Sequence, residues 1–126
     1  MILKKIKRVK KIKRVYVPIS ADKINIGHIN ILRTAKKYGK VIVGLLTDKA
    51  ISSYKTIPPL DYNYRYEILS SIKYIDQIIE QDNLDYKKII NKLRPDFFVH
   101  GDDWKNGVQK KKRDEVIRAL KKIKSK

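Results

Sequence analysis

The sequence predicts an α/β fold, an open parallel sheet with helices on both faces. Short runs rich in β-branched and aromatic residues alternate with segments of helical spacing, which is typical of chains that form parallel sheets. One of these runs, residues 41–46, contains no polar residue, as expected for a strand that is buried on both faces. The chain has 126 residues, of which 42% are apolar, a size and composition that suit one domain with its own core.

The first half of the chain predicts two strands with a helix between them. Residues 15–20 form a β-branched and aromatic run, and 41–46 form the second strand. Gly27 opens a segment whose apolar side chains share one helical face, and Gly39 ends it. The side chains of that face are Ile31, Leu32, Ala35 and Tyr38. A polar stretch follows over residues 47–60.

The second half of the chain predicts two further strands, over residues 76–80 and 96–100, and three helices. Asp61 is expected to cap the helix before the first of them. A short helix over 85–93 separates the two strands and is ended by Pro95, and a last helix runs from residue 108 to about residue 122. The expected inward side chains of the three helices are Tyr64, Ile68, Leu69 and Ile72, then Ile89, Ile90 and Leu93, then Val116, Ile117 and Leu120.

The formal net charge of +18 comes from 31 basic and 13 acidic residues, and it is concentrated at the two ends. Residues 1–14 hold eight basic and no acidic side chains, and residues 105–126 hold ten basic and two acidic ones. We therefore divide the chain into a basic extension over 1–14, a domain over 15–120 and a basic tail over 121–126. Solvated ends that reflect a compositional bias are the favoured interpretation, and contact with RNA or an anionic membrane is the alternative.

Several classes of protein are excluded by the composition. The chain has no cysteine, which excludes disulfides, a thiol nucleophile and cysteine-based metal sites. Its longest apolar runs have six residues, whereas a membrane span needs about 20. No apolar segment follows the basic N-terminus as it would in a signal peptide, so we expect a cytoplasmic protein without a transmembrane segment. Neither G-x-G-x-x-G nor the Walker A spacing occurs.

Residues suited to an anionic ligand follow the first and fourth predicted strands. Gly27 allows close approach of the backbone, and His28 lies at or near a helix start, where an imidazole and free backbone N–H groups can meet an anion together. A single histidine at such a place is more often a capping or surface residue. Residues 101–104, Gly-Asp-Asp-Trp, follow the last strand, and Trp104 could stack on a base or close the edge of the core.

Four segments taken together resemble the nucleotidyltransferase superfamily of cytidylyltransferases, with its H-x-G-H signature. They are Asn25-Ile-Gly-His28, Val41-Ile-Val-Gly-Leu-Leu-Thr-Asp-Lys49, Tyr62-Asn-Tyr-Arg65 and His100-Gly-Asp-Asp-Trp-Lys105, and they occur in the family's order. The resemblance covers residues 15–120 and extends to glycerol-3-phosphate cytidylyltransferases and to the cytidylyltransferase domains associated with phosphoenolpyruvate mutase. It implies the Rossmann-like fold of that superfamily.

The resemblance also implies which residues bind the nucleotide. His28 matches the second signature histidine, which contacts the phosphates and stabilises charge at the α-phosphate, and Lys55 and Arg65 match cationic contacts that share the catalytic role. The other expected nucleotide-binding residues are Ser20, Ala21 and Asp22 in the turn beside the triphosphate, Asn25 and Gly27 in the signature, and Gly101, Asp103 and Trp104 in the pocket loop.

The activity implied is transfer of a cytidylyl group from CTP to a small phosphate or phosphonate, with release of pyrophosphate. Acceptors of the glycerol 3-phosphate, phosphocholine, phosphoethanolamine or 2-aminoethylphosphonate type are expected. The attacking oxygen is already anionic, so positioning and charge neutralisation suffice. Mg²⁺ is expected to be carried by the triphosphate, with no metal site of the protein's own, and the expected assembly is a homodimer.

Two departures from the family pattern keep other functions open. Asn25 stands where the signature has its first histidine, and an amide cannot carry a positive charge. The family's later Ser/Thr-rich motif has no counterpart before Lys126, so we expect the family fold without its last strand and helix. The alternatives are a catalytically impaired nucleotide-binding or interaction module that kept the fold, and a basic RNA-binding protein.

Overall fold

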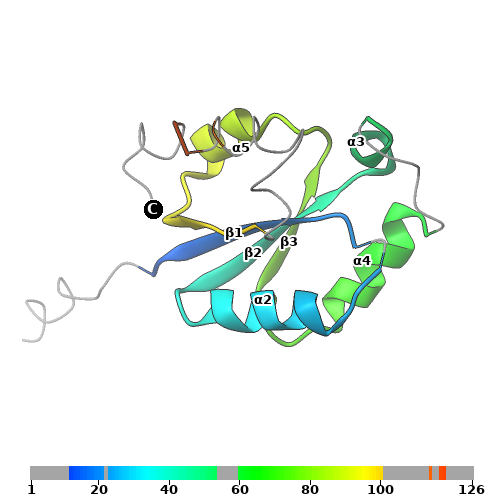
Figure 1. Ribbon diagram of the computed structural model, residues 1–126, viewed down its shortest axis with the longest axis horizontal. Helices are drawn as coiled ribbons and strands as arrows, with labels where there is room; N and C mark the ends of the chain where they lie inside the picture. The colour runs from blue at the N-terminus through cyan, green and yellow to red at the C-terminus, as the bar shows by residue number, and fades with distance from the viewer. Residues whose placement is uncertain (1–11, 22, 54–59, 101–113, 115–116, 119–126) are drawn as a thin grey trace, which may run out of the picture.

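The computed structural model describes residues 12–21, 23–53, 60–100, 114 and 117–118, and their strands form one four-stranded sheet in the order β3-β2-β1-β4 (Figure 1). All three strand pairs are parallel. The strands are β1 (Arg14–Ile19), β2 (Lys40–Leu46), β3 (Gln77–Gln81) and β4 (Phe97–Phe98). The helices are α2 (Ile26–Lys36), α3 (Asp48–Ser52), α4 (Tyr62–Ser70) and α5 (Tyr86–Leu93). In Figure 1, α2 and α4 cover one face and α5 covers the other, so the predicted α/β fold is confirmed.

The larger core lies between the sheet and the pair α2 and α4. Alternate side chains of the two central strands are buried there together with Leu32 and Ala35 of α2 and Leu69 of α4. The strand residues are Val15, Val17, Ile19, Val41, Val43 and Leu45. Both faces of β1 and β2 are buried because helices cover both, and for this reason the two strands are almost continuously apolar in sequence.

A polar contact is buried on the opposite face, beneath α5. Tyr16 is fully buried, its hydroxyl donates a hydrogen bond to Oε1 of Gln81, and Nε2 of Gln81 donates to the carbonyl of Asn83 at 3.0 Å. Burial raises the pKa of the Tyr16 hydroxyl, which therefore stays a neutral donor. A Cβ atom on Gly44 would overlap the Tyr16 hydroxyl and Gln81, so only glycine fits at that position of β2. The contact joins β1 to the end of β3 and, through Gln81, to the loop that follows it.

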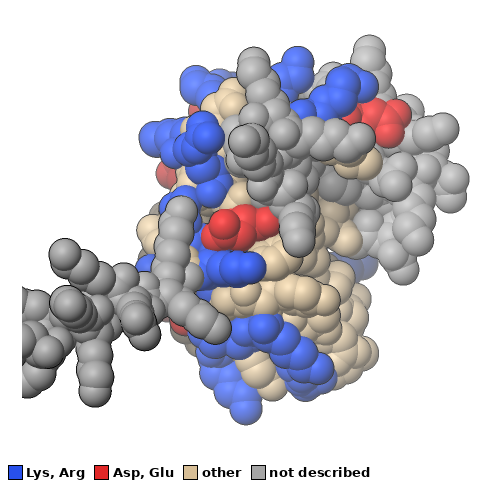
Figure 2. Space-filling model, turned by 90° about the vertical axis from the view of Figure 1, so that its left-hand side faces the viewer, with Lys and Arg blue, Asp and Glu red and all other residues tan. Residues whose placement is uncertain are grey.

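Carboxylates organise the amino end of the sheet, which faces the viewer in Figure 2 among many Lys and Arg side chains. Oδ2 of Asp76 accepts from the Val41 amide at 2.8 Å and from Nζ of Lys36 at 2.6 Å. Burial opposes ionisation of Asp76, but the hydrogen bonds from Lys36 and Val41 outweigh it and hold the pKa of that carboxyl below its usual value. Oδ2 of Asp96 accepts from the Arg14 amide at 2.9 Å, so each acid caps the start of a central strand.

Most predicted elements occur at or within a residue of their expected bounds. The Asp61 cap is confirmed, because its Oδ1 accepts from the Tyr64 amide at 2.9 Å. Arg14 is the first residue of β1, and the strand predicted for 76–80 lies one residue later. The strand predicted for 96–100 is longer than the two-residue β4. Of the predicted last helix, only residues 114, 117 and 118 lie within the described part of the chain, and they are helical.

Two details of the expected packing are wrong, and one helix has no counterpart among the predicted elements. The polar stretch 47–60 contains helix α3, which Thr47 caps by accepting from the Ala50 amide at 3.1 Å. Tyr38 lies beyond the end of α2 and is 52% exposed, with its ring against Phe97. Tyr64 is 58% exposed, because α4 turns Arg65 toward the sheet in its place. Within the described ranges, no helix is long and apolar enough to cross a membrane.

Candidate active site

The carboxyl ends of β1 and β2 meet the starts of α2, α3 and α4 at one edge of the sheet, on the right in Figure 1. In open parallel sheets, ligands bind at this edge, beyond the ends of the strands. Ser20 and Ala21 follow β1, Thr47 and Asp48 follow β2, and His28 lies in the first turn of α2. The expected site residues that the structure describes therefore come from segments that converge at one place.

Ala21 gives the turn after β1 an unusual backbone conformation. Its φ angle is 60°, in the left-handed region, and its side chain is 1% exposed. For a residue with a Cβ atom that conformation costs about 1–2 kcal/mol, so it persists only where neighbouring contacts impose it. The chain turns sharply here as it leaves β1 on its way to α2.

The start of α2 is a capping box built by Asn25 and His28. Oδ1 of Asn25 accepts from the Gly27 amide at 2.8 Å and from the His28 amide at 3.3 Å. In return, the backbone N–H of Asn25 donates to Nδ1 of His28 at 3.2 Å. The expectation of free backbone N–H groups is wrong for Gly27 and His28, because the Asn25 side chain already accepts from both. The helix dipole still makes this end of α2 positive.

These contacts fix how the half-buried His28 ring is oriented. The Asn25 backbone N–H can only donate, so Nδ1 accepts from it in the tautomer that carries the proton on Nε2. Nδ1 also lies 3.2 Å from Oδ1 of Asn25, to which it donates in the other tautomer. With its proton on Nε2, the ring offers a donor at the positive end of a helix, which is a suitable contact for a phosphate oxygen.

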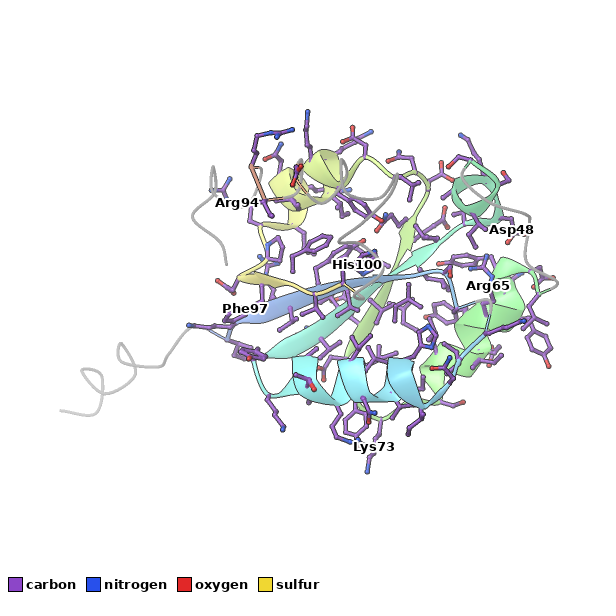
Figure 3. All side chains as sticks on the ribbon, viewed as in Figure 1. Asp48, Arg65, Lys73, Arg94, Phe97 and His100 are labelled. Carbon is purple, nitrogen blue, oxygen red and sulfur yellow. The ribbon has the colours of Figure 1, made fainter. Side chains whose placement is uncertain are left out.

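Arg65 extends from α4 into the space between the strand ends and is fully buried. Its Nη1 donates to the carbonyls of Ser20 at 2.6 Å and Leu46 at 2.7 Å, and its Nε donates to that of Leu60 at 3.1 Å. Nη2 forms an ion pair with Oδ1 of Asp48 at 2.6 Å, and Figure 3 shows these two side chains adjacent. The resemblance implies a nucleotide contact for Arg65. In the structure, the guanidinium instead donates hydrogen bonds to acceptors of the protein itself.

A second polar group lies at the end of β3. Oδ1 of Asp82 accepts from the Thr47 hydroxyl at 3.0 Å, and Oδ2 lies 3.8 Å from Nζ of Lys49. Asp82 was not among the residues expected at the site, because a single acid after a predicted strand gives no signal of its own. In the part of the chain that the structure describes, no group of three or more His, Asp or Glu residues could hold a metal ion.

The remaining expected site residues lie outside the described residues. They are Asp22 in the turn after β1, Lys55 after α3, and Gly101, Asp103 and Trp104 after β4. The basic segment 1–11 and the tail 121–126 lie outside them as well.

Comparison with known proteins identifies the family of this chain. The model of the cytidylyltransferase-like family matches residues 20–125, a range that begins at the turn after β1 and includes the capping box. The chain belongs to the cytidylyltransferase-like family. The resemblance carried by the four sequence segments is therefore confirmed.

The chain is similar to relatives that are named for different activities and that differ in length. The chain is 33% identical over 111 residues to the ethanolamine-phosphate cytidylyltransferase of Dictyostelium discoideum, covering 86% of this chain and 30% of that one. It is 35% identical over 94 residues to the glycerol-3-phosphate cytidylyltransferase of Staphylococcus aureus, covering 73% and 71%. It is 34% identical over 82 residues to the FAD synthase of Archaeoglobus fulgidus, covering 65% and 60%. The chain spans less than a third of the ethanolamine-phosphate enzyme.

A solved structure agrees with the fold. The lipopolysaccharide core biosynthesis protein of Thermoplasma volcanium superposes with a TM-score of 0.73 at 26% identity, covering 86% of this chain and 88% of that one. The Rossmann-like arrangement of the sheet and helices is thus common to both proteins.

Proposed function

We propose that this protein transfers a cytidylyl group from CTP to a small phosphate or phosphonate and releases pyrophosphate. The observation that supports the proposal is the place of His28 in the first turn of α2, where Nδ1 contacts the Asn25 backbone N–H and Nε2 is left for a ligand, within the residues 20–125 that match the family model. That donor lies at the edge of the sheet where ligands bind in folds of this class.

The reaction requires the protein to position the two substrates and to stabilise negative charge on the phosphates. An anionic oxygen of the acceptor attacks the α-phosphorus, the bond from that phosphorus to the oxygen bridging it to the β-phosphate breaks, and pyrophosphate leaves with the electron pair. His28 donates from Nε2 to a non-bridging α-phosphate oxygen, and the α2 dipole favours the same negative charge. No side chain needs to remove a proton from the acceptor. Mg²⁺ enters as part of the nucleotide substrate.

The acceptor is proposed from the names of the relatives. Phosphoethanolamine and glycerol 3-phosphate are small phosphate monoesters, and the relatives named for them match most of the domain. Phosphocholine and 2-aminoethylphosphonate share their size and their anionic oxygens, so all four belong in one assay panel. We also propose that the protein acts as a homodimer.

We expect CTP, in the presence of Mg²⁺, to bind at least about 10-fold more tightly than ATP, a difference of about 1.4 kcal/mol. The reason is membership of the cytidylyltransferase-like family. ATP is the informative competitor, because an FAD synthase is among the relatives. Competitive isothermal titration calorimetry with the two nucleotides measures the ratio. Equal or tighter binding of ATP would refute the cytidylyl assignment and leave only nucleotidyl transfer.

A second candidate is a nucleotide-binding module without turnover. The observation that favours it is Asn25, which stands at the first signature position and uses its side-chain oxygen to cap α2. Such a module would bind CTP and release no pyrophosphate with any acceptor of the panel. Pyrophosphate release therefore separates the two candidates.

A further inference from the structure

One buried guanidinium joins four segments at the candidate site. Nη1 of Arg65 bonds the carbonyls of Ser20, just after β1, and Leu46, the last residue of β2. Nε bonds the carbonyl of Leu60 ahead of α4, and Nη2 bonds Asp48, the first residue of α3. The fork geometry of arginine lets a single side chain serve all four, which the single ammonium of lysine cannot do.

The contact with Ser20 lies next to the strained residue of the turn. Ala21 follows Ser20 directly and holds a φ angle of 60° with its methyl group buried. The Arg65 bond fixes the carbonyl on one side of Ala21, and the core holds its side chain on the other. Left-handed residues other than glycine persist where surrounding contacts determine them in this way. Arg65 is thus bonded to the residue directly before the left-handed turn after β1.

Asp48 completes the arrangement and holds Arg65 in place. Oδ1 of Asp48 accepts a hydrogen bond from Nη2 of Arg65 at 2.6 Å, while the Asp48 side chain remains 44% exposed at the edge of the sheet. A fully buried arginine needs a partner charge, because desolvating an unpaired cation is costly. Asp48 supplies that charge from the first residue of α3.

We propose that Arg65 and Asp48 are positioning residues, which hold the Ser20–Ala21 turn in the conformation that delivers His28 to the nucleotide phosphates. This inference rests on the proposed function for the role of His28. It differs from the role implied by the family resemblance, in which Arg65 touches the nucleotide itself. An arginine with no exposed surface and with protein acceptors at Nε, Nη1 and Nη2 acts through the backbone it holds.

The first test is made without nucleotide, by amide hydrogen exchange of residues 23–29 in Arg65→Lys and Asp48→Asn. Both variants are expected to exchange faster at Gly27, His28 and Ile29, whose amides bond Asn25 in the wild type. Arg33→Lys and Asp85→Asn are matched controls: Arg33 is exposed on α2, and Asp85 precedes α5 without a side-chain cap bond. Exchange at residues 23–29 that is unchanged in both test variants would overturn the proposal, whether or not the protein transfers a cytidylyl group.

The second test uses steady-state kinetics with CTP. Mispositioning of a catalytic donor lowers kcat, and a displacement of about 1 Å costs about 100-fold. We expect kcat to fall at least about 10-fold in Asp48→Asn and further in Arg65→Lys, with little change in the KM for CTP. The double variant should be no worse than Arg65→Lys alone, because the two residues act as one unit. A raised KM in Arg65→Lys, together with an unaffected Asp48→Asn, would instead identify Arg65 as a nucleotide ligand.

Discussion

Replacing His28 with alanine is expected to lower cytidylyl transfer by about 100- to 1,000-fold, the usual effect of losing one preorganised donor to a developing negative charge. The substitution removes the Nε2–H group at the start of α2 and leaves the Asn25 contacts to the backbone in place. The fold should therefore survive. Pyrophosphate release with saturating CTP and acceptor measures the effect, and circular dichroism checks that the helices remain.

His28→Gln is the matched control for this prediction. A glutamine at the third position of a helix can accept from the capping amide through its carbonyl oxygen and donate through its NH₂ group. It therefore retains the acceptor that the structure gives the imidazole and the donor that we propose for it. We expect His28→Gln to keep more activity than His28→Ala. Equal activity of wild type and His28→Ala would show that the imidazole does not contact the reacting phosphate.

Replacing Tyr16 with alanine is expected to lower the free energy of unfolding by about 3–5 kcal/mol, as for other large aromatic side chains removed from a core. The ring is fully buried and lies 5.7 Å from that of Phe98, and its loss also leaves Oε1 of Gln81 without a donor. A domain of this size has about 5–15 kcal/mol in total, so the variant would be barely stable. Urea denaturation followed by circular dichroism gives the value.

Tyr16→Phe separates the two contributions. It keeps the ring and removes only the hydroxyl, so we expect a loss of about 1–3 kcal/mol from the unpaired Gln81 acceptor. If Tyr16→Phe and Tyr16→Ala were equally unstable, the ring would contribute nothing and packing against Phe98 would have to be discounted. If both were as stable as the wild type, the buried contact would have no energetic role.

The strands and helix starts could be predicted because the residues that form them carry local signals. Residues 41–46 are apolar throughout, since helices cover both faces of β2, and a short apolar run of this kind is typical of a buried parallel strand. Asp61 caps α4 with its own side chain, which is a property of a few neighbouring residues. The place of His28 in the first turn of α2 followed from the same kind of signal.

The features that shape the site depend on contacts distant in the sequence. Apolar periodicity placed Tyr64 inward, but Arg65 is buried instead because carbonyls of Ser20 and Leu46, 45 and 19 residues away, accept its hydrogen bonds. The left-handed conformation of Ala21 has no sequence signal, since alanine does not favour it. Helix α3 has five residues, too few for a periodic pattern to show.

The most direct test of the proposed function is a quantitative assay of both products. The wild-type protein is incubated with Mg²⁺, CTP and, in turn, glycerol 3-phosphate, phosphocholine, phosphoethanolamine and 2-aminoethylphosphonate. Pyrophosphate is measured enzymatically and the cytidylylated product by mass spectrometry. We predict that one acceptor yields the two products in equal amounts, and that His28→Ala yields neither above about 1% of the wild-type rate. Pyrophosphate from the wild type that never exceeds the His28→Ala level, with any of the four acceptors, would contradict the account.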